Sequence, residues 1–160
     1  MSDFRPSGFA VLPTVVKNLL IINVLFFLAT MAADVVLRID LKDYLGLHYI
    51  GASDFQPYQL VTYMFMHGDF AHLFFNMFAL WMFGRTLEYE LGSQRFLIYY
   101  IACGVGAALV QYGVAWLAGE LPLYLVGASG AVYGILLAFG MIFPNEKMFV
   151  FPIPVPIKAK

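Results

Sequence analysis

The stretch VGASGAVYG, residues 126–134, opens the last long apolar segment of the chain. It places one hydroxyl, that of Ser129, between glycines at the start of this segment. Two interpretations are open, because serine favours helix N-cap positions and a nucleophile gains from the positive end of a helix dipole. Gly127 permits a positive φ just before Ser129. Gly130 and Gly134 form the small-xxx-small pattern by which membrane helices approach closely.

The composition is that of an integral membrane protein. Of the 160 residues, 62% are hydrophobic and 12% are charged, whereas soluble domains carry about 25% charged residues. The formal net charge of −1 argues against a nucleic-acid partner. Cys103 is the single cysteine, so an intrachain disulfide is impossible, and we interpret it as a small buried hydrophobe.

The apolar segments predict an all-α fold, a polytopic membrane helical bundle in one domain over residues 1–160. Its expected spans are residues 14–36, 60–83, 96–117 and 129–143. The fourth covers only about 22 Å at ~1.5 Å per residue, whereas a bilayer core is about 30 Å thick. Ser129 is therefore expected below the membrane surface, where irregular backbone is tolerated only beside protein or water.

Two connecting segments carry predictions of their own. The first, residues 37–59, mixes acidic residues with tyrosines and leucines, a composition typical of segments at the membrane interface. The second is expected to continue as helix over residues 85–91, with Gly92 as its C-terminal stop and Ser93 as the next N-cap.

The distribution of lysine and arginine predicts the orientation in the membrane. Seven lie on one expected side, and only Arg38 and Lys42 lie on the other. The seven are Arg5, Lys17, Arg85, Arg95, Lys147, Lys158 and Lys160. By the positive-inside rule, both termini are expected in the cytoplasm, and Ser129 is expected in the outer half of the membrane.

Polar side chains inside the second span suggest a site. His72 and Asn76 are four residues apart, so they share one face of a helix, whereas His67 is expected to point away from His72. The pair either hydrogen-bonds to a neighbouring helix as packing or serves a site in a cavity. Because the topology places Ser129 at a similar depth, the three residues together resemble a nucleophile beside an oxyanion site.

Metal binding is the competing use of the same histidines. The spacing of His67 and His72 is similar to the histidine boxes of membrane oxygenases, but such diiron sites need many histidines and this chain has three. We therefore expect neither a metal nor another cofactor.

Three ordered motifs resemble the rhomboid intramembrane serine proteases. They are HGDFAHLFFN at residues 67–76, Glu88-x3-Gly92-Ser93-x-Arg95-Phe96, and GASG at residues 127–130. The resemblance covers about residues 14–157 and implies a six-helix core, a Ser–His dyad and no metal.

The resemblance also assigns roles to individual residues. It implies that Ser129 is the nucleophile and that His72 and Asn76 form the oxyanion site with the Ser129 backbone N–H. It places Gly127 and Tyr133 in substrate binding, Tyr133 being the aromatic on which the family's catalytic histidine stacks. His67 matches a structural histidine. The Trp-Arg pair of the family's first loop appears here as Tyr58-Gln59.

One departure from the family pattern concerns the general base. The family's base is a histidine in the sixth helix, but no histidine follows His72. We therefore expect an N-terminal portion of a rhomboid, truncated after the fourth transmembrane helix and inactive by itself.

The expected function is that of a serine endopeptidase cleaving transmembrane protein substrates in a lipid bilayer, such as the bacterial inner (plasma) membrane. The alternative is a non-catalytic rhomboid-like scaffold that binds membrane proteins, although such a protein does not need a nucleophile.

Overall fold

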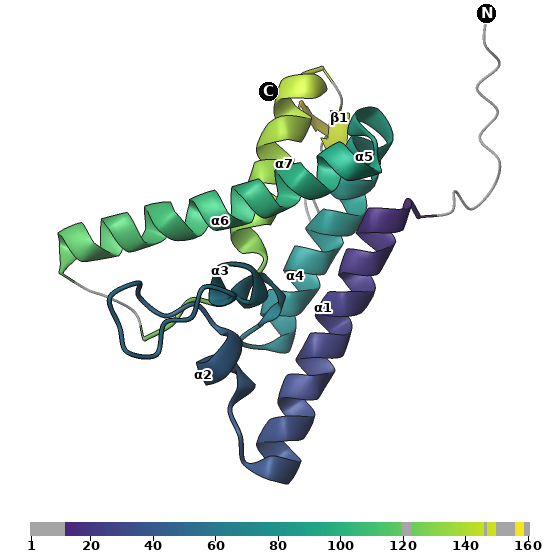
Figure 1. Ribbon diagram of the computed structural model, residues 1–160. Helices are drawn as coiled ribbons and strands as arrows, with labels where there is room; N and C mark the ends of the chain where they lie inside the picture. The colour runs from purple at the N-terminus through teal and green to yellow at the C-terminus, as the bar shows by residue number, and fades with distance from the viewer. Residues whose placement is uncertain (1–11, 120–122, 146, 150–155, 159–160) are drawn as a thin grey trace, which may run out of the picture.

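The computed structural model describes residues 12–119, 123–145, 147–149 and 156–158. The described chain is all-α apart from one short antiparallel strand pair (Figure 1). The long helical elements are α1 (Thr14–Ala32) with its π-helical extension η1 (Ala33–Leu37), α4 (Phe70–Ala79) with η3 (Leu80–Gly84), α5 (Arg85–Leu91), α6 (Ser93–Ala118) and α7 (Ser129–Ile142). The short ones are α2 (Leu41–Leu45), α3 (Gln59–Thr62) and η2 (Tyr63–Phe65), followed by strands β1 (Lys147–Phe149) and β2 (Pro156–Lys158).

Two described helices are long and apolar enough to cross a membrane. They cover Thr14–Leu37 and Ser93–Ala118, and the apolar helix Ser129–Ile142 is shorter. Their bounds lie close to the expected spans 14–36, 96–117 and 129–143. The first helix begins directly after Pro13, whose missing N–H costs nothing at a helix start.

The segment expected as one span over residues 60–83 is not one helix. It begins as the short turns α3 and η2, breaks at residues 66–69 and resumes as α4 at Phe70. The break has a local cause: Met66 is extended, and the Asp69 carboxylate caps α4 by accepting the His72 N–H at 2.8 Å. An aspartate at an N-cap starts a new helix where apolar periodicity alone predicts continuation.

The junction between α5 and α6 corrects a second prediction. Gly92 ends α5 with φ 81°, a value that favours glycine, as expected. However, Gly92 is also the N-cap of α6, and Ser93 is already its first helical residue. The Ser93 hydroxyl donates instead to Glu88 Oε1 at 2.6 Å.

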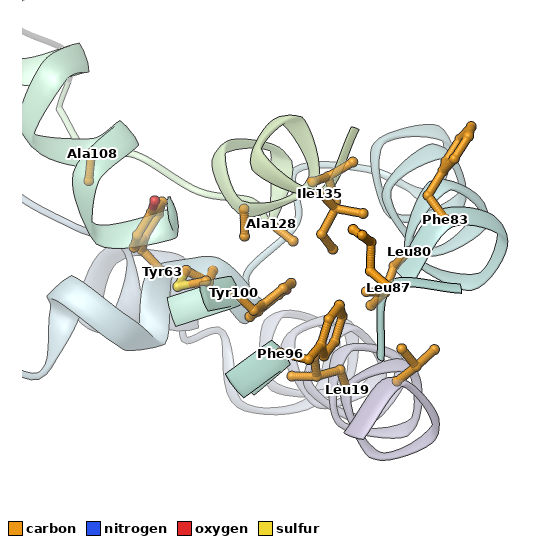
Figure 2. Packing of buried hydrophobic residues seen from close by; sticks show 14 of the residues in the cluster. Leu19, Tyr63, Leu80, Phe83, Leu87, Phe96, Tyr100, Ala108, Ala128 and Ile135 are labelled. Carbon is orange, nitrogen blue, oxygen red and sulfur yellow. The ribbon is translucent and has the colours of Figure 1, made fainter. Parts of the chain in front are cut away.

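The core lies where α1, η3, α5, α6 and α7 meet (Figure 2). Its largest buried apolar side chains include Leu80, Leu87, Phe96, Tyr100 and Ile135. The packing of α6 against α7 is close because small residues face each other. A methyl group added at Gly130 would lie 2.5 Å from Ala107 Cβ, and one at Gly134 would lie 2.5 Å from Cys103 Sγ. The small-xxx-small pattern therefore has the structural consequence expected of it.

The first loop is organised around Gln59, which stands where the rhomboid pattern has arginine. The buried Gln59 amide accepts from the His48 and Gln56 N–H groups and donates to the carbonyls of Tyr44 and Asp54, at 3.0–3.3 Å. The neutral amide thus accepts hydrogen bonds through its oxygen and donates them through its NH₂ group, so it satisfies both N–H and C=O groups of the loop backbone.

The first loop is also fastened to the segment that leads into α7. Leu47 and Leu125 form a two-way backbone bridge, and the Tyr112 hydroxyl of α6 donates to the Leu47 carbonyl. Partial burial, with the nearby Asp40 carboxylate, raises the pKa of Tyr124, whose hydroxyl donates to Asp40 Oδ2 at 3.4 Å. These contacts fix the approach of the chain to Ser129.

Candidate active site

Ser129 is the first residue of α7. The N-cap is Ala128, and no side chain caps this helix, so the interpretation of Ser129 as an N-cap is wrong. The first intrahelical bond runs from the Val132 N–H to the Ala128 carbonyl at 3.0 Å. The N–H groups of the first turn precede that bond and are left without helical partners. Ser129 therefore places its hydroxyl beside several free donors at the positive end of the helix dipole.

Ser129, His72 and Asn76 line one hollow of about 360 Å³ between α4 and α7, which we call the His72 hollow. The other residues that line it are Phe75, Ala79, Val132, Tyr133 and Leu136. The structure thus brings together three residues from two segments separated by more than 50 positions in the sequence.

His72 and Asn76 are also linked within α4. The Asn76 Nδ2 donates to the His72 carbonyl at 3.0 Å, and the Asn76 side chain is buried. An amide NH₂ has two hydrogens, so one remains for another acceptor. The described contact is local to the helix; it is not the interhelical bond that a pure packing role would require.

Gly127 holds the backbone against the imidazole of His72. Its φ is 114°, it is buried, and its N–H donates to the Tyr63 carbonyl at 2.9 Å. A Cβ added here would lie 2.6 Å from both Cε1 and Nε2 of His72. Glycine is therefore needed for its positive φ and for the space that His72 occupies.

Replacing Gly127 by alanine is expected to displace the His72 ring and the loop before Ser129. A misplacement of about 1 Å typically costs about 100-fold in an active site, so we expect a loss of about 10- to 100-fold in Ser129 reactivity. The measurement is turnover in a longer form that is active. Gly113→Ala is the control, because an added Cβ there meets nothing within 4 Å. Equal activity of the two variants would contradict the assigned role of Gly127.

Tyr133 lies one turn after Ser129 and is 73% exposed. It lines the His72 hollow and also a second hollow of about 300 Å³, the Tyr63 hollow, which Ser129 likewise borders. In the described part of the chain no ring stacks on Tyr133. Its face is therefore open to a ligand or to another chain segment.

The Tyr63 hollow contains polar residues that the sequence reasoning missed. Tyr63 and Gln111 line it together with Ala107 and Gly130. The Tyr63 hydroxyl donates to the Gly104 carbonyl at 2.7 Å. Gln111 could have been found, because a polar residue within an apolar span usually serves a site. Nothing in the pattern marks Tyr63.

His67 does not point away from His72, contrary to expectation. The two rings meet edge to face with centroids 5.0 Å apart. The reason is the break before α4: His67 precedes the helix in backbone without regular secondary structure, so helical spacing does not govern its direction. Among the described residues no three histidine, cysteine, aspartate or glutamate side chains converge as metal ligands.

Residues 54–159, more than half of the chain, match the Rhomboid domain family. The chain belongs to the rhomboid family. It is accordingly an integral membrane protein with an all-α fold.

Three relatives show the extent of the similarity. Rhomboid protein 1, mitochondrial, of Saccharomyces cerevisiae is 38% identical over 96 residues, which are 58% of this chain and 27% of the relative. Rhomboid protease GluP of Bacillus subtilis is 36% identical over 94 residues, 58% of this chain and 17% of the relative. Putative rhomboid protease YdcA of the same bacterium is 31% identical over 107 residues, 66% of this chain and 52% of the relative. The chain thus spans from under a fifth to about half of the length of these relatives.

Proposed function

We propose that this chain carries the nucleophile and oxyanion site of an intramembrane serine endopeptidase. The observation that carries the proposal is the shared hollow of Ser129, His72 and Asn76 at the N-terminus of α7. Two relatives are named as rhomboid proteases, one of them putatively. Their names support a protease as the reaction class.

The roles follow from the chemistry of the side chains. Ser129 Oγ attacks a peptide carbonyl and gives its proton to a base, forming a tetrahedral intermediate with a negatively charged oxygen. The Ser129 N–H, the His72 ring and the remaining Asn76 N–H donate to that oxygen, and such donors stabilise the transition state more than the ground state. Apart from His72, the residues that line the two hollows at Ser129 include no imidazole, so the base is not among those other residues.

The substrate class follows from the setting of the site. The His72 hollow opens on apolar side chains, and the exposed Tyr133 stands at its edge. An extended segment of a transmembrane protein could lie against Gly127 and Tyr133 with its scissile carbonyl at Ser129. We place both termini in the cytoplasm and the site in the outer half of the membrane, on the lysine and arginine distribution.

Asn76→Ala tests the oxyanion assignment. In a longer, active form it is expected to lower turnover by roughly 10- to 1,000-fold, because one donor to the developing charge is lost. The measurement is cleavage of a transmembrane substrate in liposomes. Asn18→Ala, the same change at an exposed position of α1, is the control.

The same experiment separates the protease from a non-catalytic scaffold. If the folded Asn76→Ala variant kept the turnover of the unaltered protein, the oxyanion role would be contradicted and Asn76 would serve packing only. If the Ser129→Ala variant of a longer, active form cleaved the substrate as fast as the unaltered protein, the protease proposal would be refuted. Retained substrate binding without any cleavage in the unaltered protein would favour the scaffold.

A further inference from the structure

A third hollow, of about 420 Å³, lies at the C-terminal end of α1, and we call it the α1-end hollow. One wall is apolar and consists of Phe27, Met31 and Phe70. In Figure 1 this end of α1 projects past α4, and the chain turns back from it to α2. The hollow thus lies between the helix end, the returning loop and the segment before α4.

The position of the α1-end hollow is at a membrane interface. Asp34 lies in the last turns of the span Thr14–Leu37, and a carboxylate is tolerated near a span end but costly at its centre. Met31 and Phe70 are 53% and 69% exposed in the protein, so this apolar wall continues onto a lipid-facing surface.

The other wall carries charged side chains, and its negative charges outnumber its positive ones. Asp34 and Asp40 contribute two carboxylates, and Lys42 contributes one ammonium. Lys42 Nζ lies 3.9 Å from Asp40 Oδ1, whereas Asp34 has no ion-pair partner within the described ranges. The wall therefore offers one site for an anionic group and one uncompensated site for a cation.

The inner end of the hollow is the buried His67, whose ring contacts that of His72. His67 is 1% exposed; the Phe65 backbone interacts with its ring, but no hydrogen bond of normal geometry reaches either ring nitrogen in the described part of the chain. Buried polar atoms are rarely left unpaired, and a neutral imidazole can accept a hydrogen bond. The hollow thus also presents an unused acceptor to an N–H or water donor.

The spacing of these groups does not suit a metal ion. No three acidic, histidine or cysteine side chains of the described residues converge closely enough to hold one. A ligand that fits must place a cation and an anion apart and carry an apolar part beside them.

We propose that the α1-end hollow binds a phospholipid whose headgroup carries a primary ammonium, as in phosphatidylethanolamine. The ammonium lies against Asp34, with its further N–H groups directed to Asp40 and, through water, to His67. The phosphate lies against Lys42, and the acyl chains follow Met31 and Phe70. This proposal does not depend on the protease function.

The experiment is native mass spectrometry of the purified 160-residue chain with three dioleoyl lipids. Phosphatidylcholine keeps the phosphate but its quaternary ammonium has no N–H, and phosphatidylglycerol keeps the phosphate but lacks the cation. We expect phosphatidylethanolamine to be retained about three- to fivefold more than either, the range for one exposed ion pair. Equal retention of all three lipids would overturn the proposal.

Two variants locate the site. Asp34→Asn is expected to lower retention of phosphatidylethanolamine to that of phosphatidylcholine, and Lys42→Gln to lower retention of both. Asp54→Asn, at an exposed position of the first loop that does not line the hollow, is the control and should retain the preference. Circular dichroism establishes that each variant is folded. An Asp34→Asn protein that keeps the full preference would place the lipid elsewhere and refute the assignment.

Discussion

Replacing Glu88 by alanine is expected to lower the free energy of unfolding by about 3–5 kcal/mol, because each buried donor left unpaired costs about 1–3 kcal/mol. The Glu88 side chain is 2% exposed. Its Oε1 accepts from the Val15 N–H at 2.9 Å and from the Ser93 hydroxyl at 2.6 Å, and its Oε2 accepts from the Val16 N–H at 2.7 Å.

Two of these three bonds, those from the Val15 and Val16 N–H groups, connect segments more than 70 positions apart in the sequence. They fasten the first turn of α1, with its otherwise unpaired N–H groups, to the junction of α5 and α6. A carboxylate at a helix N-terminus also gains from the helix dipole. Alanine removes the acceptors and leaves the backbone donors of Val15 and Val16 unpaired, which is the costly outcome for buried groups.

The measurement is reversible unfolding in mixed micelles. Glu90→Ala is the control, because Glu90 is an exposed residue of the same helix and should change stability by under about 1 kcal/mol. Glu88→Gln is expected to fall between the two, since its amide keeps one acceptor oxygen but loses the charge. Equal stabilities of the Glu88 and Glu90 variants would contradict the role of Glu88.

The fold could be predicted from the sequence where a pattern acts locally. The apolar runs predicted the positions of α1, α6 and α7 to within a few residues, because a long apolar run favours a continuous helix. Gly92 could be predicted as a helix stop, and the Gly130–Gly134 pair as a close helix contact. The motifs around His72 and Ser129 predicted the family, which residues 54–159 confirm.

What could not be predicted depends on which groups meet in space. The break before α4 follows from the Asp69 cap, and the polar run His67-Gly68-Asp69 at the break is short enough that the apolar residues on both sides of it predicted one continuous span. The contact of His67 with His72 is a consequence of that break. Likewise, Gln59 and Glu88 are single polar residues whose partners lie up to 73 positions away, and no periodicity in one sequence locates such partners.

The candidate site could be predicted from the sequence only in part. Gly127 could be expected to take a positive φ, but its second role, giving space to His72, required the packing of the loop against α4. The Tyr63 hollow could not be foreseen, because it is formed by η2, α6, α7 and the loop before α7 together.

The 160-residue chain is expected to show no Ser129-dependent labelling by a fluorophosphonate probe. A serine hydroxyl is a weak nucleophile at neutral pH and needs an adjacent base. The loss of the histidine base lowers the rate by roughly 10⁶-fold in a serine protease. The question is therefore whether any group in this chain can take the proton.

None of the three histidines is free for that role. His48 lies in the first loop, with its Nε2 2.6 Å from the Asp43 carbonyl. His67 lines neither hollow at Ser129. His72 does line the His72 hollow, but the ring nitrogen that donates to the oxyanion is not available to accept the serine proton. No carboxylate or lysine lines either hollow.

The measurement is a time course of labelling on purified chain in detergent, with Ser129→Ala as the blank and an active rhomboid protease as the positive control. The expected trace for the chain coincides with that of the blank. Labelling that depends on Ser129 and matches the rate of the active protease would show that a base exists within these residues. His72 would then be the only imidazole placed to act, and the oxyanion site would have to be built from Asn76 and the N–H groups of the first turn of α7 alone.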